Sequence, residues 1–436
     1  MTPDTLNVDS NGNISIGGVA VAELSEQFGT PLYVLDYTTL TRQISHYRDL
    51  LTELQPAGMV CYAGKAFLSV AMVRVLEDAG VGLDVVSGGE LHTALKAGFT
   101  PSRIVFHGNL KTAKELSLAV TSKVGYVVVD SLDELMQLGQ IAIEHKTVQN
   151  ILLRLTPGIE AHTHEFIQTG QFDTKFGFGI GDGLADAAVE TALSTPGISL
   201  KGFHAHIGSQ ILEEAPFLAN ADILLEYARK WHASHQWWPE VLDLGGGFGV
   251  RYQSADNPPD LVRIVQGIRQ RLTTHTPSGM PVPRLFLEPG RSIVAEAGIT
   301  VYTVGAVKTV VGGKKYVAVD GGMGDNIRPA LYQAQYQAMV DSKVKGTAKE
   351  VVTLAGRYCE TGDLIVREAK LPSLQVGDRV IVLGTGAYNY AMASNYNRVP
   401  RPAVVAVANG QARLWVRGET WDDLVQYDEP FSGFPQ

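Results

Sequence analysis

The sequence contains a lysine that is placed for carbonyl chemistry. Lys65 follows an apolar run around Val60, within the segment Tyr62-Ala63-Gly64-Lys65-Ala66. A lysine at the end of an apolar strand can lose part of its hydration, and a dehydrated amine is able to form an imine with a carbonyl cofactor. A lone lysine is more often a surface residue whose stem lies on apolar neighbours. Lys65 is therefore a candidate only in combination with other groups.

A triple glycine is a candidate phosphate site. Gly245, Gly246 and Gly247 follow another apolar run. Three glycines allow backbone N–H groups to approach a phosphate closely, and Arg291 would add a positive charge beside it. Three glycines alone are more often a tight turn, so this signal also depends on its combination with Lys65.

Glu288 is a carboxylate in an apolar setting. It ends the run Leu285-Phe286-Leu287, where its charge is costly unless it meets a positive partner. A protonated pyridine nitrogen is such a partner, and holding that proton makes the ring a stronger electron sink for a carbanion. A salt bridge to Arg291 is the alternative interpretation. His206 would stack on the ring and Ser209 would bind its phosphate, although an isolated histidine is more often a core residue.

The elements between these groups must bring them together. From about residue 58 to about residue 290, β-branched apolar runs alternate with amphipathic segments, which is the pattern of repeated βα units. There are about eight runs, the number that a closed parallel barrel needs. They centre on Val60, Leu83, Val105, Val128, Leu153, Phe203, Leu242 and Phe286. Helical spacing occurs at Ser69 to Ala79, Glu90 to Ala97, Ala113 to Val120 and Leu132 to Glu144. Because barrel enzymes react at the C-terminal ends of their strands, the polar clusters that follow the runs are expected on one rim.

The two ends of the chain have a different pattern. Ile14 to Val21 is typical of a hairpin, and the sequence after Ala297 is rich in Val, Thr, Tyr and Gly. Strands are expected at Val304 to Val311, Lys315 to Val319, Glu350 to Leu354, Arg379 to Leu383 and Ala403 to Val407. We expect an α/β fold with a (β/α)8 TIM-like barrel at residues 36–290. A C-terminal all-β domain at residues 291–436 would also take in the N-terminal strands of residues 1–35.

Composition narrows the class of protein. The 36 Lys and Arg residues against 45 Asp and Glu residues give a net charge of −9, which provides no attraction to nucleic acid or anionic lipid. Two cysteines, Cys61 and Cys359, are too few for a disulfide framework and are expected to be reduced thiols. Neither a secretory signal nor an apolar run of about 20 residues is visible. We therefore expect a cytoplasmic protein that binds neither nucleic acid nor membrane.

Together these segments resemble the diaminopimelate decarboxylases. These are fold-type III pyridoxal-phosphate enzymes, a group that includes ornithine decarboxylase and alanine racemase. The similarity runs from about residue 28 to about residue 405. It is carried by Tyr62-Ala63-Gly64-Lys65-Ala66, His204-Ala205-His206-Ile207-Gly208-Ser209-Gln210, Gly245-Gly246-Gly247, Glu288-Pro289-Gly290-Arg291, Arg328-Pro329-Ala330-Leu331-Tyr332, Cys359-Glu360-Thr361-Gly362-Asp363, Gly386-Ala387-Tyr388 and Asn395-Tyr396-Asn397. Ala161-His162-Thr163-His164-Glu165, Thr169-Gly170 and Lys175-Phe176-Gly177 resemble the mobile barrel loop of the same family.

The resemblance implies a role for each matching residue. Lys65 would hold pyridoxal phosphate as a Schiff base, His206 would stack on its ring, and Glu288 would pair with the ring nitrogen. The remaining cofactor-binding residues would be Asp84, Ser209, Gly245, Gly246, Gly247, Gly290, Arg291 and Tyr388. The substrate would meet Arg291, Arg328, Tyr332, Glu360 and Tyr388. Cys359 resembles the proton donor, and it would reach with Glu360 into the partner's site of a homodimer. No metal ion is expected.

The implied reaction is decarboxylation of meso-2,6-diaminopimelate to L-lysine and carbon dioxide, the last step of lysine biosynthesis. The distal end of this substrate carries a carboxylate and an ammonium, for which Arg328 and Glu360 offer opposite charges. Decarboxylases of D-ornithine, D-lysine or carboxynorspermidine share the fold and remain alternatives, as does a non-catalytic relative. A racemase is disfavoured because the Cys359-Glu360 pair would have no role in it.

Overall fold

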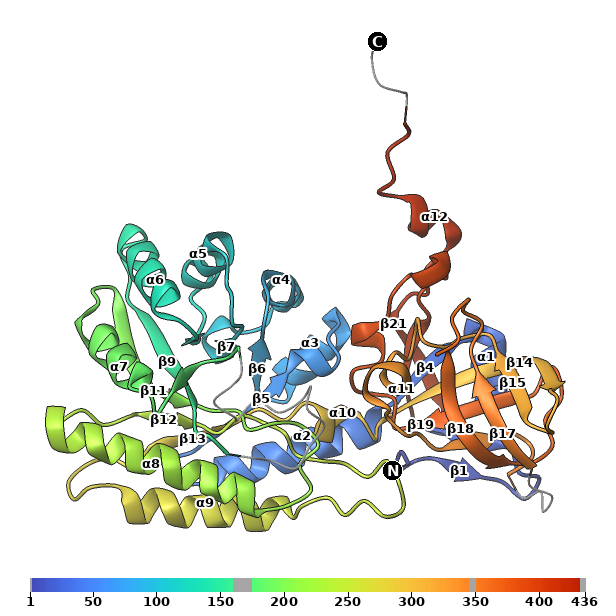
Figure 1. Ribbon diagram of the computed structural model, residues 1–436, viewed down its shortest axis with the longest axis horizontal. Helices are drawn as coiled ribbons and strands as arrows, with labels where there is room; N and C mark the ends of the chain where they lie inside the picture. Colours follow the sequence, from blue (N-terminus) through green and yellow to red (C-terminus); the bar gives the residue numbers. More distant parts are fainter. Residues whose placement is uncertain (1, 160–174, 345–349, 432–436) are drawn as a thin grey trace. The chain divides into compact units, whose positions relative to one another are not determined.

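The computed structural model describes residues 2–159, 175–344 and 350–431 (Figure 1). The chain divides into two compact units. The barrel unit comprises Leu40–Ala295, and the β unit comprises Met1–Thr39 together with Glu296–Gln436. The segments around His162 and Thr169, which resemble a family loop, lie outside the described residues.

The barrel unit is built on a closed ring of parallel strands. The strands are β5 (Met59–Ala63), β6 (Gly82–Val85), β7 (Ile104–Phe106), β8 (Tyr126–Val129), β9 (Gln149–Thr156), β11 (Ile198–His204), β12 (Val241–Asp243) and β13 (Arg284–Leu287). Neighbours in the sequence pair with each other, β13 pairs with β5, and β10 (Phe178–Gly179) is added beside β9. Each predicted apolar run lies in one of the ring strands, so the predicted barrel is confirmed.

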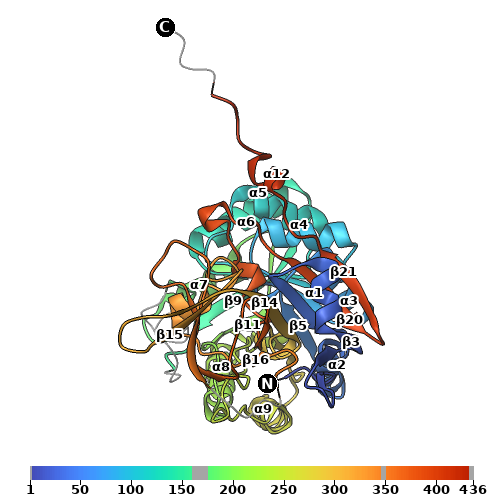
Figure 2. The ribbon, with the colours of Figure 1, turned by 90° about the vertical axis from the view of Figure 1, so that its right-hand side faces the viewer.

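Helices surround the ring, as Figure 2 shows for α3 to α9 around β5, β9 and β11. They are α2 (Tyr37–Thr52), α3 (Val70–Asp78), α4 (Gly88–Ala97), α5 (Ala113–Ser122), α6 (Leu132–Glu144), α7 (Leu184–Ser194), α8 (Ala215–His235), α9 (Leu261–His275) and the short α10 (Arg291–Val294). Side-chain oxygens of Ser69, Ser87, Thr112 and Ser131 accept backbone N–H bonds at the starts of α3 to α6. These caps satisfy donors that the first helical turn leaves unpaired, which explains where the predicted helices begin.

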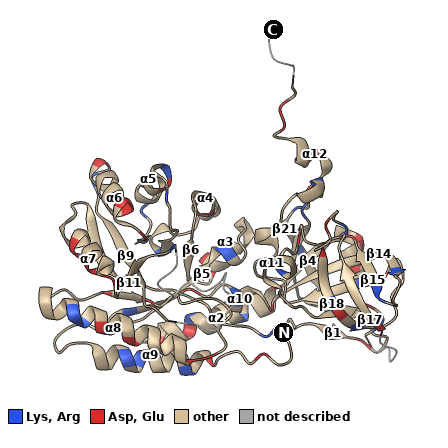
Figure 3. Cartoon of the chain, in the orientation of Figure 1, with Lys and Arg blue, Asp and Glu red and all other residues tan. Residues whose placement is uncertain are grey.

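The surface charges are mixed. Figure 3 shows basic and acidic residues interspersed along α8 and α9. In the part of the chain that the structure describes, no helix is both long enough and apolar enough to cross a membrane.

The barrel interior is apolar where it does not carry the rim groups. One cluster consists of Cys61, Val105, Val128, Leu152, Val241 and Phe286, contributed by β5, β7, β8, β9, β12 and β13. Burial, followed by the nearby Asp243 and Glu288, raises the pKa of the Cys61 thiol well above its ordinary value. Cys61 is therefore a small apolar core residue, not a reactive thiol.

The β unit contains a mixed sheet that joins the two ends of the chain. Its strands are β4 (Leu32–Asp36), β14 (Gly298–Thr309), β15 (Lys315–Val319), β16 (Ala338–Val340), β17 (Glu350–Ala355), β18 (Leu364–Leu371), β19 (Arg379–Leu383), β20 (Ala403–Ala408) and β21 (Gln411–Val416). The N-terminal β4 lies between β14 and β20. The predicted all-β companion that includes the N-terminus is thus confirmed. The predicted strand at Val304 is wrong in its start, because β14 begins at Gly298.

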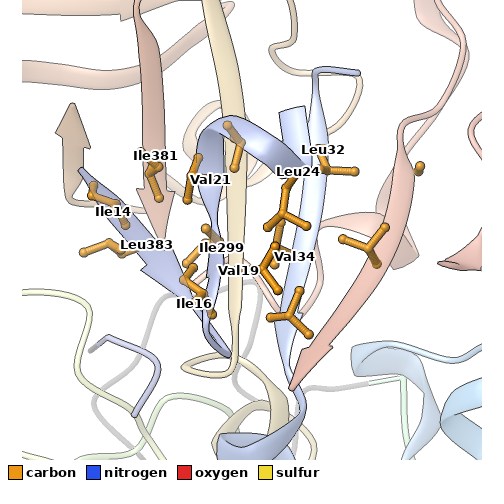
Figure 4. Packing of buried hydrophobic residues seen from close by; sticks show 14 residues of the cluster. Ile14, Ile16, Val19, Val21, Leu24, Leu32, Val34, Ile299, Ile381 and Leu383 are labelled. Carbon is orange, nitrogen blue, oxygen red and sulfur yellow. The ribbon is translucent and has the colours of Figure 1, made fainter. Parts of the chain in front are cut away.

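The N-terminal hairpin packs on this sheet. The strands β2 (Ile14–Ile16) and β3 (Val19–Ala20) pair antiparallel beside β1 (Asn7–Val8), and α1 (Val21–Phe28) follows directly. Figure 4 shows Ile14, Ile16 and Leu24 packed against residues of β14 and β19. Burying these side chains removes apolar surface from water, which stabilises the association of both chain ends.

Candidate active site

The candidate site residues of the barrel unit lie at one rim. Lys65 lies in the short helix η1 (Gly64–Ala66) after β5, and Asp84 lies in β6. His107 follows β7, His204 ends β11, and Glu288 follows β13. In a parallel barrel the carboxyl ends of all strands meet on the same side. The predicted shared rim is therefore what the strand order produces.

The exposure of Lys65 differs from what the sequence predicts. Its side chain is exposed, so the expectation that the apolar strand dehydrates its amine is wrong. The backbone of Lys65 continues beyond the strand as one helical turn, which carries the side chain out of the apolar layer. Its positive charge nevertheless acts on the neighbouring Asp84, Glu90 and His206. Lys65 thus belongs to the same cluster of polar groups as Asp84 and His206.

Glu288 is held by two histidines. The Nε2 atom of His204 lies 3.1 Å from Oε2 of Glu288, within hydrogen-bond distance. The Nε2 atom of His107 lies 2.5 Å from Oε1 as an ion-pair contact, and 3.8 Å from Oδ1 of Asp84. All four side chains are buried. The alternative salt bridge from Glu288 to Arg291 is not what the structure shows.

The surroundings determine which of the buried carboxyl groups carries a charge. Burial by itself would raise the pKa of Glu288, but His107 and His204 outweigh it and hold that pKa well below its ordinary value. Burial and the charge of Glu288 raise the pKa of Asp243 well above the ordinary value. Burial raises the pKa of Asp84 to about 6. Of these three carboxyl groups, Glu288 is therefore the one whose surroundings favour the ionised form most, and those of Asp243 and Asp84 oppose it.

The Oε1 atom of Glu288 can accept a further hydrogen bond. It is buried, and it lies 2.5 Å from Nε2 of His107 without the geometry of a hydrogen bond among the described residues. Each carboxylate oxygen has two lone pairs and can accept from more than one donor. A buried, ionised carboxylate of this kind would accept the proton of a pyridine nitrogen, so this side of the barrel fits pyridoxal phosphate.

The backbone of the triple glycine positions neighbouring side chains and leaves one N–H group for a phosphate. The N–H groups of Gly245 and Gly246 donate to Oδ1 of Asp243 at 2.9 Å and to Nδ1 of His206 at 3.2 Å. Gly245 and Gly247 have φ angles of 67° and 98°, in the region that favours glycine. A Cβ atom on Gly246 would lie 2.1 Å from the carbonyl oxygen of Glu288. Two of the three N–H groups therefore position neighbouring side chains, and the phosphate role applies best to Gly247.

His206 is oriented by this contact. Because its Nδ1 accepts a hydrogen bond, its proton lies on Nε2. Burial, followed by the charge of Lys65, lowers the pKa of His206 well below its ordinary value. A neutral imidazole of fixed orientation is suited to stack on a cationic ring, as predicted for His206.

Arg291 lies in a second polar group on the same rim. Its Nη2 donates to Oγ of Ser209 and its Nη1 to the hydroxyl of Tyr252, both at 2.9 Å. A Cβ atom on Gly290 would lie 3.0 Å from the Cβ atoms of Ala63 and Ala66, which flank the lysine segment. Ser209 and Arg291 are thus adjacent, as a shared phosphate would require. Tyr252 was not predicted, because a tyrosine five residues after a glycine run has no distinctive sequence signal.

Tyr252→Phe is expected to weaken cofactor binding without unfolding the protein. It removes one hydrogen bond that orients Arg291, which is worth about 1 kcal/mol or a roughly fivefold higher dissociation constant for pyridoxal phosphate. Titration of apoprotein by tryptophan fluorescence measures this constant. Tyr427→Phe, at an exposed position, is the control. An unchanged constant in Tyr252→Phe would show that Arg291 does not depend on this contact.

A buried arginine was also missed. Arg154 of β9 lies with its guanidinium carbon 4.1 Å from the ring centre of Phe176 and with Nε 3.9 Å from Oδ1 of Asp130. The N–H of Gly177 donates to the other oxygen of Asp130 at 3.0 Å. The segment Lys175-Phe176-Gly177 is therefore anchored to the barrel. Arg154 lies inside an apolar run, where sequence pattern predicts only a core position.

The β unit contains a second set of predicted residues. Arg328 begins the short helix α11 (Arg328–Tyr332) and is buried. Its guanidinium carbon lies 5.8 Å from the ring centre of Tyr332 and 5.7 Å from that of Tyr388. Cation–π contacts of this kind hold an arginine in place while its N–H groups remain able to bind an anion. The structure brings these three predicted residues together.

Cys359 and Glu360 are exposed on a neighbouring loop of the β unit. The backbone N–H of Cys359 donates to Oδ1 of Asn397 at 2.8 Å. The buried carboxylate of Asp363 accepts the N–H groups of Met323 at 2.6 Å and Tyr358 at 2.8 Å. Asp363 therefore fastens the Cys359 loop to the segment that leads to Arg328.

Asp363→Ala is expected to lower the free energy of unfolding by about 2 to 4 kcal/mol, because two buried N–H groups lose their acceptor. Urea unfolding followed by circular dichroism measures the change. Asp78→Ala, at an exposed position on α3, is the matched control. If both variants unfold at the same urea concentration, Asp363 does not fasten the loop.

The comparison with known proteins now identifies the family. A family model for the pyridoxal-binding domain of pyridoxal-dependent decarboxylases matches residues 38–295. The diaminopimelate decarboxylase of Bacillus subtilis is 45% identical over 431 residues, and the match covers 98% of both chains. The chain belongs to the diaminopimelate decarboxylase family.

Solved structures support this assignment. The diaminopimelate decarboxylase of M. jannaschii in complex with L-lysine matches with a TM-score of 0.92, 33% identity and 99% coverage of both chains. The enzyme of Helicobacter pylori complexed with L-lysine matches with a TM-score of 0.85 and 32% identity, covering 93% of this chain and 98% of that one. The family resemblance predicted from the motifs is therefore confirmed. Pyridoxal phosphate is the cofactor of this decarboxylase, and the barrel unit corresponds to its binding domain.

Proposed function

We propose that this protein removes carbon dioxide from meso-2,6-diaminopimelate and forms L-lysine, with pyridoxal phosphate bound to Lys65. The observation that carries the proposal is the buried Glu288, whose pKa His107 and His204 hold well below its ordinary value, so that it is a carboxylate able to pair with a protonated ring nitrogen. It lies on the barrel rim that also bears Lys65. Identity of 45% to a diaminopimelate decarboxylase over nearly the whole chain supports the choice of substrate.

Different residues of the barrel unit would bind different parts of the cofactor. Lys65 forms the covalent link, Glu288 pairs with the ring nitrogen, and His206 stacks on the ring. Asp84, which interacts with the charge of Lys65 and lies 3.8 Å from Nε2 of His107, would balance the positive charge of the lysine amine. Ser209, Gly247, Gly290 and Arg291 surround the phosphate, and Gly245 and Gly246 hold their neighbours in place. The cofactor supplies an electron sink for the carbanion that remains when carbon dioxide leaves.

The β unit would recognise the distal end of the substrate. Arg328, held by Tyr332 and Tyr388, binds the distal carboxylate, and Glu360 binds the distal ammonium. A substrate without the distal carboxylate would lack its ion pair with the buried Arg328, which is worth about 2 to 5 kcal/mol. This difference would favour diaminopimelate over L-lysine and simple diamino acids as substrates.

Cys359 would return a proton to the α-carbon. A thiol carries an S–H proton that it can donate to a carbanion held within reach. Its exposure on the loop, together with that of Glu360, is compatible with a site that is completed by a second copy of the chain. We therefore include a homodimer with shared active sites in the proposal, together with a cytoplasmic location that suits two free cysteines.

The test is carbon dioxide release by purified protein supplied with pyridoxal phosphate. Release from meso-diaminopimelate, with little from D-ornithine, D-lysine or carboxynorspermidine, is the expected result. Faster release from one of the three rivals would replace the substrate and keep the chemistry. If none of the four compounds loses carbon dioxide, the protein is a non-catalytic relative and the proposal fails.

Mixing two inactive variants tests the shared site. Lys65→Ala and Cys359→Ala affect different units of the chain. If each active site takes Lys65 from one copy and Cys359 from the other, mixed dimers contain one intact site. Activity that neither variant has alone is the expected result. A mixture that exchanges subunits and stays inactive would argue against sharing.

A further inference from the structure

Two histidines of the rim have no role in the function proposed so far. His107 begins the loop after β7 and His204 ends β11, and their side chains are 5% and 1% exposed. Their rings are 4.8 Å apart between centres and inclined by 68°. A buried imidazole must find partners for its nitrogen atoms, so two of them on one carboxylate require an explanation.

Both histidines present the same atom to Glu288. Nε2 of His204 lies 3.1 Å from Oε2, in hydrogen-bond geometry, and Nε2 of His107 lies 2.5 Å from Oε1. The two oxygen atoms of the carboxylate are therefore contacted separately, from β11 and from the loop after β7. Two contacts from different strands fix the plane of a carboxylate, which rotates freely about its last bond when it has one contact.

We propose that His107 and His204 are positioning residues that hold the Glu288 carboxylate in one plane, in which it would pair with the ring nitrogen of pyridoxal phosphate. The inference rests on the proposed role of Glu288 as the partner of that nitrogen. His204 acts as a hydrogen-bond donor to Oε2, and His107 is the close polar neighbour of Oε1.

The charges around the group support this assignment. Burial lowers the pKa of His204 to about 4, so His204 is a neutral imidazole that has one N–H to donate. Its Nδ1 is buried without a hydrogen bond among the described residues, which places that N–H on Nε2. Both histidines contribute to the low pKa of Glu288.

Other charged groups near the Glu288 carboxylate also affect its ionisation. Asp84 from β6 and Asp243 from β12 disfavour a second negative charge, whereas Arg154 from β9 favours it. The pKa of Asp243 is raised well above its ordinary value by burial and by the charge of Glu288, so the surroundings favour negative charge on Glu288 over Asp243. Both histidines contact the Glu288 carboxylate directly through Nε2.

A merely structural role makes a different prediction. If the histidines only fill the barrel interior, their replacement by leucine would change stability and leave the bound cofactor unaffected. If they position Glu288, replacement changes the protonation of the ring nitrogen. Nitrogen-15 NMR of holoenzyme prepared with ring-labelled pyridoxal phosphate reports this protonation directly, and independently of activity.

The experiment compares His204→Leu, which removes the donor, with His204→Gln, which restores an N–H near the position of Nε2. His107→Leu is examined in parallel, and His92→Leu, at an exposed position on α4, is the matched control. In the wild type and in His92→Leu we expect a protonated ring nitrogen. His204→Leu and His107→Leu should shift the signal toward the neutral form and lower kcat about 10- to 100-fold, and His204→Gln should recover most of both.

The possible results distinguish the positioning role of the two histidines from the proposed role of Glu288. A neutral ring nitrogen in the wild type would contradict the proposed role of Glu288 itself. A protonated nitrogen in the wild type and in both leucine variants would overturn the positioning role alone. Equal loss of cofactor from His204→Leu and His204→Gln would also overturn it, because the restored N–H would then have no effect.

Discussion

Lys65→Ala is expected to abolish carbon dioxide release from meso-diaminopimelate, with a fall in kcat of about three orders of magnitude or more. The lysine is the only group proposed to link the cofactor covalently, so the variant also loses the visible absorption of the bound cofactor. Its exposed position makes the change tolerable for the fold. Carbon dioxide release and the absorption spectrum of the dialysed protein measure the two effects.

Lys114→Ala is the matched control for this prediction, because Lys114 is exposed on α5 and belongs to no proposed site. It should keep both activity and absorption. If Lys65→Ala retained a covalently bound chromophore after dialysis, another amine would have to hold the cofactor, and the interpretation of the whole rim would change.

Arg328→Gln is expected to lower kcat/KM for meso-diaminopimelate by about 30- to 3,000-fold, since a buried carboxylate would lose its cationic partner. Arg328 is 7% exposed and is held between the rings of Tyr332 and Tyr388, so glutamine cannot restore its charge or its reach. Because D-lysine lacks the distal carboxylate, its kcat/KM should change little. Steady-state kinetics with both compounds give the comparison.

Arg367→Gln, at an exposed position of β18, is the control for loss of a positive charge in the same unit. It should leave the kinetics of both compounds unchanged. An equal loss of kcat/KM for diaminopimelate and D-lysine in Arg328→Gln would show that Arg328 does not bind the distal carboxylate.

The sequence pattern predicts the barrel well because the ring strands are mostly apolar on both faces. β5 to β9 and β11 to β13 are buried between the interior and the helices, so each appears as a short continuous apolar run. Strands of the β unit are harder to find. β18 (Leu364–Leu371) contains Arg367, Glu368 and Lys370 on its exposed side, and its pattern resembles that of a surface loop.

In the candidate active site, too, the sequence predicts some features well and others poorly. Lys65, Glu288 and the glycine run follow directly from apolar runs, and the strand order of a parallel barrel places them on one rim. The alternative partner for Glu288, Arg291, is only three residues away in the sequence. In the fold Arg291 instead contacts Ser209 and Tyr252, and Glu288 contacts His107 and His204.

By itself, the sequence determined the class of fold and the family and indicated the candidate lysine, because runs of apolar residues and short motifs are local properties of the chain. Only the tertiary structure decided the charge of Glu288, the proton position on His206 and the exposure of Lys65. These properties depend on which groups the closed barrel brings within hydrogen-bond distance from strands far apart in the sequence. Burial and hydrogen bonding act through space, so no local pattern records them.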